Sequence, residues 1–225
     1  MAKGFIPVEA IHSIESPPWS RLFTGPVSRL SFDKAWVWMK DSSVADHLRQ
    51  SGVEEVIHAN AFTESEHAAE HLLATAGLPA PELPDLWLAG ADRVIVHPGS
   101  GSPAKCWPFF AELMERIPES VVLIGPCESQ IQTNRPRLQG LSLQSVAEEL
   151  RRCRAFIGND SGITHLAAYL GCPTIALFGP TDPRIWGPIG RRVTTLRRTP
   201  LSSISVDEIR KLLWTIRSRL RSRWT

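Results

Sequence analysis

Residues able to bind a sugar or a phosphate gather in the segment IGNDSGITHLAAYLGCPTIALFGPTDP, residues 157–183. Asp160 follows an apolar run and can accept hydrogen bonds from sugar hydroxyls. Ser161 and Gly162 open a helical stretch, where free backbone N–H groups attract anions. His165 lies one helical turn after Ser161, on the same face. The alternatives are that Asp160 is an N-cap and that His165 is a packed core histidine.

A second loop of this kind is HPGSGSPAKCWP, residues 97–108, which follows an apolar run and precedes a helical pattern. Gly101 permits close backbone approach, Ser100 and Ser102 add hydroxyl donors, and Lys105 adds a positive charge before the helix. Helix-start N–H groups with a lysine form a phosphate site. The pattern is neither a Walker loop nor GxGxxG, so a tight turn with a solvated lysine is an equal alternative.

An acidic residue stands between these two loops. Glu128 follows the apolar run SVVLIGP, residues 120–126. A carboxylate at the end of such a strand can bind both hydroxyls of a ribose, as acidic residues do in dinucleotide-binding folds. The alternative is an exposed acid at a helix start.

The elements around these loops alternate between strands and helices through the second half of the chain. Continuous apolar strands separated by helices predict a parallel sheet covered on both faces, and right-handed crossovers make it doubly wound. Ligands should lie beyond the carboxyl ends of its strands. The predicted strands are 93–97, 120–126, 155–160 and 173–180, and the predicted helices are 107–118, 142–153 and 161–171.

The first half shows the same alternation less completely. We predict strands at 8–14, 35–40 and 53–59, helices at 42–52 and 64–77, and a proline-rich linker at 78–88. The domain boundary is expected in this linker. Three strands are few for an α/β domain, so this part is expected either to pack closely on the second half or to lack a segment in front of it.

Composition favours an ordinary globular protein of the cytoplasm. Apolar residues make up 43% and charged residues 21%, and no apolar run approaches the length of a membrane span or a signal peptide. Four scattered cysteines predict reduced thiols. Residues 191–225 hold ten Lys or Arg against two acids. Such a tail can bind nucleic acid or lipid headgroups, but without an aromatic-interleaved motif a solvated helix face is favoured, and no nucleic-acid partner is expected.

A competing class of enzyme is suggested by HAAEH, residues 67–71, which matches the H-x-x-E-H pattern of inverted zinc peptidases. His67 and His71 could share a metal with Glu70 as the base. No downstream helix offers an obvious third ligand, so an ordinary solvated helix face is favoured and no metal is expected.

Taken in order, HPGSGSPAKCWP, IGPCE, FIGNDSGITHLAAYLGCPTIALFGPTDP and WGPIG resemble the C-terminal domain of glycosyltransferase family nine, the lipopolysaccharide heptosyltransferases. The resemblance is strong over roughly residues 90–190 and faint over 8–88. It implies an α/β fold of two Rossmann-like lobes (GT-B type), the C-terminal lobe a complete doubly wound parallel sheet and the N-terminal lobe partial. It also implies a donor that is a nucleoside diphosphate sugar, ADP-heptose-like, with no other cofactor.

The resemblance assigns donor-binding roles residue by residue. It places the ribose at Glu128, the transferred sugar at Asp160 and the phosphates beside His165. The residues expected near the diphosphate are Ser100, Gly101, Ser102, Lys105, Ser161 and Gly162. It assigns no catalytic residue in this chain.

The N-terminal region departs from the family pattern. The family's N-terminal domain opens with a strand and a Gly-Asp turn, whereas MAKGFIPVEA is similar to a later strand, so the opening unit is expected to be absent. The implied function is transfer of a sugar to a lipopolysaccharide or to another glycan or lipid-linked acceptor. The reaction is expected in the cytoplasm or at the inner membrane face. The alternative is a truncated, inactive sugar-nucleotide-binding or interaction module.

The resemblance and the patterns together predict three parts of the chain. They are a partial acceptor-side domain with its linker at 1–88, a donor-binding domain at 89–205, and a helix at 206–225 that crosses back to the N-terminal lobe. Ile209, Leu213 and Leu220 belong to one apolar stripe of this helix, and its arginines lie largely off the stripe.

Overall fold

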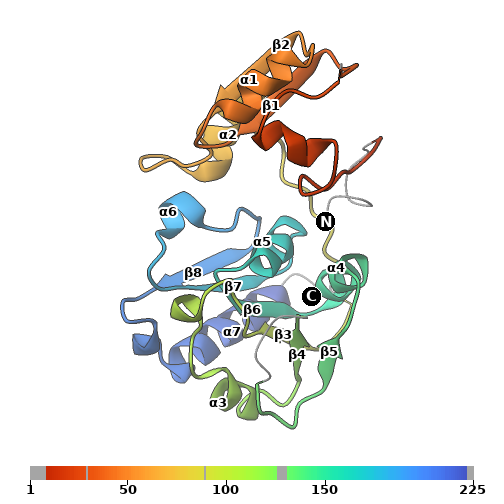
Figure 1. The fold of residues 1–225 in the computed structure, drawn as a ribbon. Helices are drawn as coiled ribbons and strands as arrows, with labels where there is room; N and C mark the ends of the chain where they lie inside the picture. The colour runs from red at the N-terminus through yellow and green to blue at the C-terminus, as the bar shows by residue number, and fades with distance from the viewer. Residues whose placement is uncertain (1–8, 29, 89, 126–130, 222–225) are drawn as a thin grey trace. The chain divides into compact units, whose positions relative to one another are not determined.

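The computed structural model describes residues 9–28, 30–88, 90–125 and 131–221. Contacts divide the chain into two compact units, residues 1–81 and 82–225 (Figure 1). The division falls within the proline-rich segment 78–88.

The second unit is built on a six-stranded sheet in which every neighbouring pair of strands is parallel. The strand order is β5-β4-β3-β6-β7-β8, so the chain winds outward from β3, returns beside it at β6 and winds the other way. This is the doubly wound order that the apolar runs predicted. The strands are β3 (Val94–His97), β4 (Ser120–Ile124), β5 (Arg137–Gln139), β6 (Ala155–Asn159), β7 (Thr174–Phe178) and β8 (Val193–Arg197).

Helices cover both faces of this sheet (Figure 1). Phe110 of α3 (Phe110–Glu115) and Ile209 of α7 (Val206–Arg221) pack with Val94, Ile157 and Leu177 in one core. On the opposite face, the helices α4 (Leu143–Arg152) and α5 (Gly162–Tyr169) pack against alternate residues of the same strands, among them Ile95, Leu123 and Phe156. Burial on both faces explains why β6 and β7 consist mainly of apolar residues.

The segment Glu82–Leu88 lies along the second unit and is held by contacts from widely separated residues. Arg192 forms an ion pair with Asp85 at 2.7 Å, and the indole N–H of Trp87 donates to the carbonyl of Cys153. The guanidinium of Arg192 lowers the pKa of Asp85 and also lies over the Trp87 ring. The segment therefore folds as part of the second unit.

The first unit contains a two-stranded parallel sheet of β1 (Lys34–Trp38) and β2 (Glu55–Ala59). Helix α1 (Ser43–Gln50) packs on it through Val44 and Leu48, and a short 3₁₀ helix (Trp19–Phe23) completes this core. Helix α2 (Ala68–Ala76) ends at Gly77, whose φ is 68°. The helix ends predicted from Gly77 and Gly171 are thus confirmed by positive φ angles.

The strand predicted at 8–14 is wrong over its described part. Residues 9–14 form no strand, and all of their side chains are exposed. Ile11 and Ile14 are three positions apart and so lack the period-two alternation of a half-buried strand, and β1 pairs only with β2 among the described residues. Scattered β-branched residues do not make a strand when no partner supplies the hydrogen bonds.

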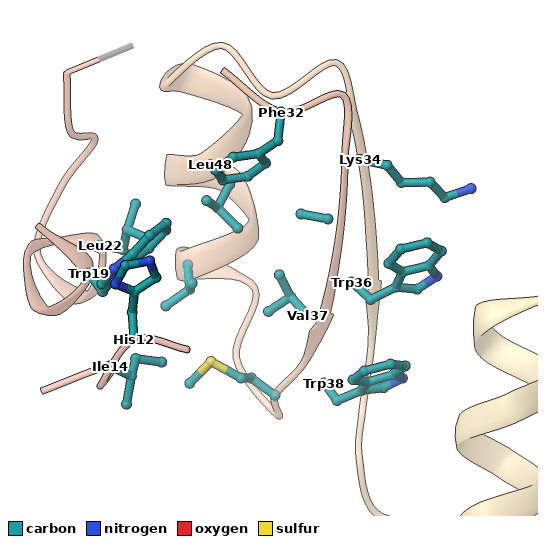
Figure 2. Close-up of a pocket in the computed structure, with 13 residues that line it drawn as sticks. His12, Ile14, Trp19, Leu22, Phe32, Lys34, Trp36, Val37, Trp38 and Leu48 are labelled. Atoms are coloured by element: carbon teal, nitrogen blue, oxygen red, sulfur yellow. The ribbon is translucent and has the colours of Figure 1, made fainter. Parts of the chain in front are cut away.

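An apolar groove of about 490 Å³ runs beside β1 in the first unit. Figure 2 shows Trp36 and Trp38 pointing to one side of β1 and Val37 to the other, with Trp19 across the groove from Val37. The indoles of Trp36 and Trp38 are each 39% exposed. Of the described residues that line the groove, only His12 and Lys34 carry titratable groups, so these residues do not supply the convergent polar groups of a phosphate or sugar site.

Helix α7 carries the predicted C-terminal stripe. Val206, Ile209 and Leu213 are buried in the core of the second unit, while Trp214, off the stripe, is 70% exposed. Crossing of this helix to the first unit stays a prediction. Among the described residues, α7 and the other helices fall short of the length and apolar character that a bilayer span requires.

Candidate donor-binding site

The candidate site lies in the second unit, where the loops after β3, β6 and β7 meet. Strands β3 and β6 are adjacent and parallel, with His97 opposite Gly158, so both loops leave the same edge of the sheet. The chain turns to opposite sides of the sheet after these two strands, which opens a crevice at their carboxyl ends. The two loops singled out from the sequence are the ones that flank this position.

Asp160 is the centre of the hydrogen-bond network at this edge. The ammonium of Lys105 lies 2.8 Å from its Oδ2, and the Thr181 hydroxyl donates to the same oxygen at 2.7 Å. The Ser100 hydroxyl donates to the Asp160 backbone carbonyl at 2.7 Å. Asp160 is only 8% exposed, so its charge is held by these donors within the protein. The N-cap alternative for Asp160 is wrong, because Ser161 caps α5.

Asn159, fully buried at the end of β6, forms hydrogen bonds with both ends of the first loop, residues 97–108. Its side-chain amide donates to the Pro98 carbonyl at 2.7 Å, and its Oδ1 accepts from the Trp107 N–H at 3.0 Å. Trp107 is in turn held by its indole N–H, which donates to the Ile204 carbonyl. The loop that carries Ser100 and Lys105 therefore has a defined shape before any ligand binds.

The first loop does not lead directly into a helix, which corrects the prediction of two helix starts. Residues Pro103–Lys105 form a 3₁₀ turn, in which the Lys105 N–H donates to Ser102, and α3 begins only at Phe110. The bulky run from Cys106 to Phe109 separates the turn from α3. An anion at this loop would therefore meet the Lys105 charge and the Ser102 hydroxyl rather than a helix dipole, since the Ser100 hydroxyl already donates to the Asp160 carbonyl.

The second loop does begin a helix. Ser161 is the N-cap of α5, and its hydroxyl accepts from the Thr164 N–H at 3.4 Å. A Cβ added to the exposed Gly162 would meet no atom within 4 Å, and the same holds at Gly101. His165 lies one turn into α5 and is half-buried, so it is not a packed core histidine. The first turn of α5 thus offers N–H groups to an anion at an uncrowded surface.

A cavity of about 270 Å³ lies beside the start of α5. Its lining is mainly apolar and includes Leu123, Ile124, Leu143 and Ile163, together with the buried His97. An apolar cavity next to an anion site suits a flat heterocyclic base. Glu128, predicted at the ribose, lies outside the described residues.

The histidines of HAAEH are engaged by the protein. His71 contacts Glu66 Oε1 at 2.8 Å through Nδ1 and the Asn60 carbonyl at 2.7 Å through Nε2. His67 caps α2 by accepting the Ala69 N–H at its Nδ1. A metal at this motif would have to displace these partners. Across the described ranges, His, Cys, Asp and Glu side chains form no group of three suited to a metal.

Two side chains of the network were not foreseen as site residues. Asn159 and Thr181 each stand in a polar corner at the end of a predicted strand, and this position is the signal that the sequence offers. The role of Asn159 does not follow from that signal, since it depends on Pro98 and Trp107, which are more than fifty positions away.

Comparisons with known proteins identify the family that the chain resembles. Residues 44–211 match the model of glycosyltransferase family 9 (heptosyltransferase). Lipooligosaccharide heptosyltransferase 2 of Haemophilus influenzae is 32% identical over 114 residues, which is 42% of this chain and 33% of that protein. Lipopolysaccharide heptosyltransferase 1 of Pseudomonas aeruginosa is 36% identical over 129 residues, 51% of this chain and 36% of that protein. The chain spans about a third of the length of these two relatives.

The fold has solved counterparts as well. The Escherichia coli heptosyltransferase WaaC, solved with ADP, matches with a TM-score of 0.63 and 16% identity over 89% of this chain and 79% of that one. This likeness confirms the predicted fold class, two Rossmann-like α/β units of the GT-B type. Because the family model covers most of the sequence, the chain belongs to glycosyltransferase family 9, the heptosyltransferases.

Proposed function

We propose that the second unit binds an ADP-linked sugar, ADP-heptose or a close relative, as the donor for glycosyl transfer. The observation that carries this proposal is the convergence of Lys105, Asp160 and the first turn of α5 at one edge of the doubly wound sheet. The neighbouring apolar cavity is suited to the base. The proposal is supported by the family and by the ADP named with the solved E. coli relative.

Each part of the donor has a proposed place. The diphosphate lies between Lys105, the hydroxyl of Ser102 and the N–H groups of Ser161 and Gly162, with Ser100, Gly101 and His165 beside it. The sugar lies at Asp160, the ribose at Glu128 and the adenine in the cavity lined by Leu123 and Ile163. In this arrangement the ligand spans the carboxyl ends of β3, β4 and β6.

The proposed reaction is transfer of the sugar to a hydroxyl of a lipopolysaccharide-type glycan acceptor. The acceptor hydroxyl releases its proton to solvent as its oxygen forms a bond to the anomeric carbon, the bond from that carbon to the diphosphate breaks, and ADP leaves with the electron pair. Lys105 and the start of α5 stabilise the charge that develops on the leaving phosphate. This positive charge makes a metal ion unnecessary. A cytoplasmic enzyme working at the inner membrane face fits such an acceptor.

Calorimetry with ADP and ADP-heptose tests the donor site, with UDP and GDP as comparison ligands. We expect saturable one-to-one binding of the adenine nucleotides and weaker binding of the others. Equal affinity for all three nucleoside diphosphates would contradict the assignment of the cavity to adenine. Absence of ADP binding would contradict the donor site itself.

A second experiment separates a transferase from an inactive binding module. The protein is incubated with ADP-heptose and a heptose-deficient lipopolysaccharide core, and ADP release is followed over time. A transferase releases ADP in proportion to acceptor, whereas a binding module holds the donor without turnover. The inactive module is the second candidate because the described first unit has only two strands.

A further inference from the structure

The loop after β7, the third strand that ends at the site, contributes the side chain of Thr181. Its role is separate from phosphate binding. Thr181 follows β7 and is half-buried, and its hydroxyl lies 2.7 Å from Asp160 Oδ2. Neither the sequence motifs nor the family assignment gives Thr181 a function. Its only side-chain hydrogen bond among the described residues is this one, so its influence on a ligand must pass through Asp160.

The position of Thr181 is fixed by its surroundings. A Cβ on Gly179 would lie 3.3 Å from the Leu201 side chain and 3.7 Å from the Ala104 carbonyl, so the β7 loop packs tightly against both segments. The Thr199 hydroxyl donates to the Gly179 carbonyl at 3.5 Å. A well-packed loop therefore holds the Thr181 hydroxyl against Asp160. A side chain held in this way can orient the Asp160 carboxylate accurately.

Two donors on one oxygen orient the Asp160 carboxylate. Lys105 and Thr181 both bind Oδ2, and no described residue donates to Oδ1. Rotation of the carboxylate would break both bonds at once in a nearly dry environment, where hydrogen bonds to charged groups are strongest. Oδ1 is thus the acceptor left for a ligand, and it belongs to the residue placed at the donor sugar.

From this geometry we infer that Thr181 is a positioning residue that turns Asp160 toward a hydroxyl of the donor sugar. It thereby raises the affinity for the nucleotide sugar without raising the affinity for the nucleotide. Lys105 has two partners in this arrangement, the diphosphate and Asp160, whereas Thr181 acts on the sugar alone. The inference rests on the proposed donor site.

The test compares two ligands across three forms of the protein. Calorimetry measures the Kd of ADP and of ADP-heptose for the wild type, Thr181→Val and Thr181→Ser. Valine keeps the shape of threonine and removes the hydroxyl, whereas serine keeps the hydroxyl. For T181V we expect ADP-heptose binding to weaken by roughly two- to tenfold, the loss of one hydrogen bond, with ADP affinity unchanged. T181S should bind both ligands like the wild type.

A double variant checks that the effect passes through Asp160. In the Asp160→Ala background, which leaves no side-chain oxygen for the threonine hydroxyl to orient, T181V should cause no further loss of ADP-heptose affinity. The inference is overturned if T181V weakens both ligands equally, if it weakens neither, or if the two substitutions weaken ADP-heptose binding independently. A wild type that binds no ADP would instead overturn the donor site on which the inference stands. Thermal unfolding of each variant confirms that a folded protein is being compared.

Discussion

The ammonium of Lys105 lies 2.8 Å from the Asp160 carboxylate, so the cation predicted for the diphosphate is also the partner of the acid predicted for the sugar. The Lys105 side chain is 31% exposed and that of Asp160 9%. The lysine can therefore reach a ligand from the solvent side while it neutralises a nearly buried acid.

Replacement of Lys105 by alanine should weaken ADP binding by about 1–3 kcal/mol, since a charge-assisted hydrogen bond to phosphate is lost. It should also lower the free energy of unfolding by about 1–3 kcal/mol, because Asp160 keeps its burial and loses its cation. Calorimetry and urea denaturation measure the two effects. The exposed Lys211 provides the control, as Lys211→Ala should change neither. An unchanged ADP affinity in K105A would contradict a phosphate-binding role for Lys105.

Two glycines at the site should respond in opposite ways to alanine. Gly162→Ala should leave stability unchanged or slightly higher, because the new methyl group meets no neighbour and the residue is helical. It should weaken ADP binding at least severalfold if phosphate approaches the start of α5. Gly158→Ala should destabilise the fold by about 1–3 kcal/mol, since its Cβ would lie 2.7 Å from the Phe156 ring. Normal ADP binding by folded G162A would contradict the proposed phosphate position.

The stability of the first unit should depend on pH through His71. The pKa of His71 is raised above its ordinary value, mainly by the hydrogen bond to the Asn60 carbonyl and to a lesser extent by the hydrogen bond to Glu66. Only the protonated imidazolium can donate to both partners. The folded-state pKa therefore exceeds the unfolded one. The stabilisation is fully present below about pH 6.5 and is lost as the pH rises through the raised value.

Melting temperature followed from about pH 5.5 to pH 9 measures this dependence. His71→Gln removes the titrating group, and its profile should lack the decline that the wild type shows. Parallel profiles for the two proteins would assign the decline to other groups.

Purified protein should carry no stoichiometric zinc, and EDTA should leave nucleotide binding intact. The reason is local, since both ring nitrogens of His71 already face protein oxygens. Elemental analysis decides the matter. One zinc per chain, lost in His67→Ala, would establish HAAEH as a metal site.

Helix α7 should stabilise the second unit through its buried stripe. Ile209→Ala removes a fully buried side chain and should cost about 2–5 kcal/mol of unfolding free energy, whereas Trp214→Ala, at a largely exposed position, should cost little. Truncation before Val206 should lower the melting temperature further and leave binding to anionic liposomes weak. If truncation kept the melting temperature and abolished liposome binding, α7 would be a membrane helix instead.

The sequence predicted the central strands of the second unit well and its edges poorly. Strands β6 and β7 are buried on both faces, so the runs from Ala155 and from Thr174 contain little except apolar residues. The edge strands β5 and β8 were missed, because they are short or partly exposed and include Arg137 and Thr194. Their strand conformation comes from pairing with β4 and β7, which local composition does not reveal.

The candidate site likewise has features that local sequence predicts and features that depend on strand pairing. Lys105, Asp160 and Ser161 stand in short polar loops after apolar runs, so their positions followed from the strand pattern. That Lys105 would bind Asp160, and that Thr181 would share the same oxygen, depends on the lateral order of three strands. Strand order is decided by packing across the whole unit and has no local signature in the sequence.

The carboxylate of Asp160 joins loops that lie 76 positions apart along the chain, from Lys105 to Thr181. These loops come together only when β3, β6 and β7 stand side by side, so no fragment that lacks one of the three strands can assemble the arrangement. A ligand held there would bind the native unit and not its unfolded chain, which makes nucleotide affinity a reporter of sheet assembly. A variant that loosens the sheet far from Asp160, for instance in the core beneath α7, should therefore raise the apparent Kd for ADP once it leaves an appreciable fraction of the molecules unfolded.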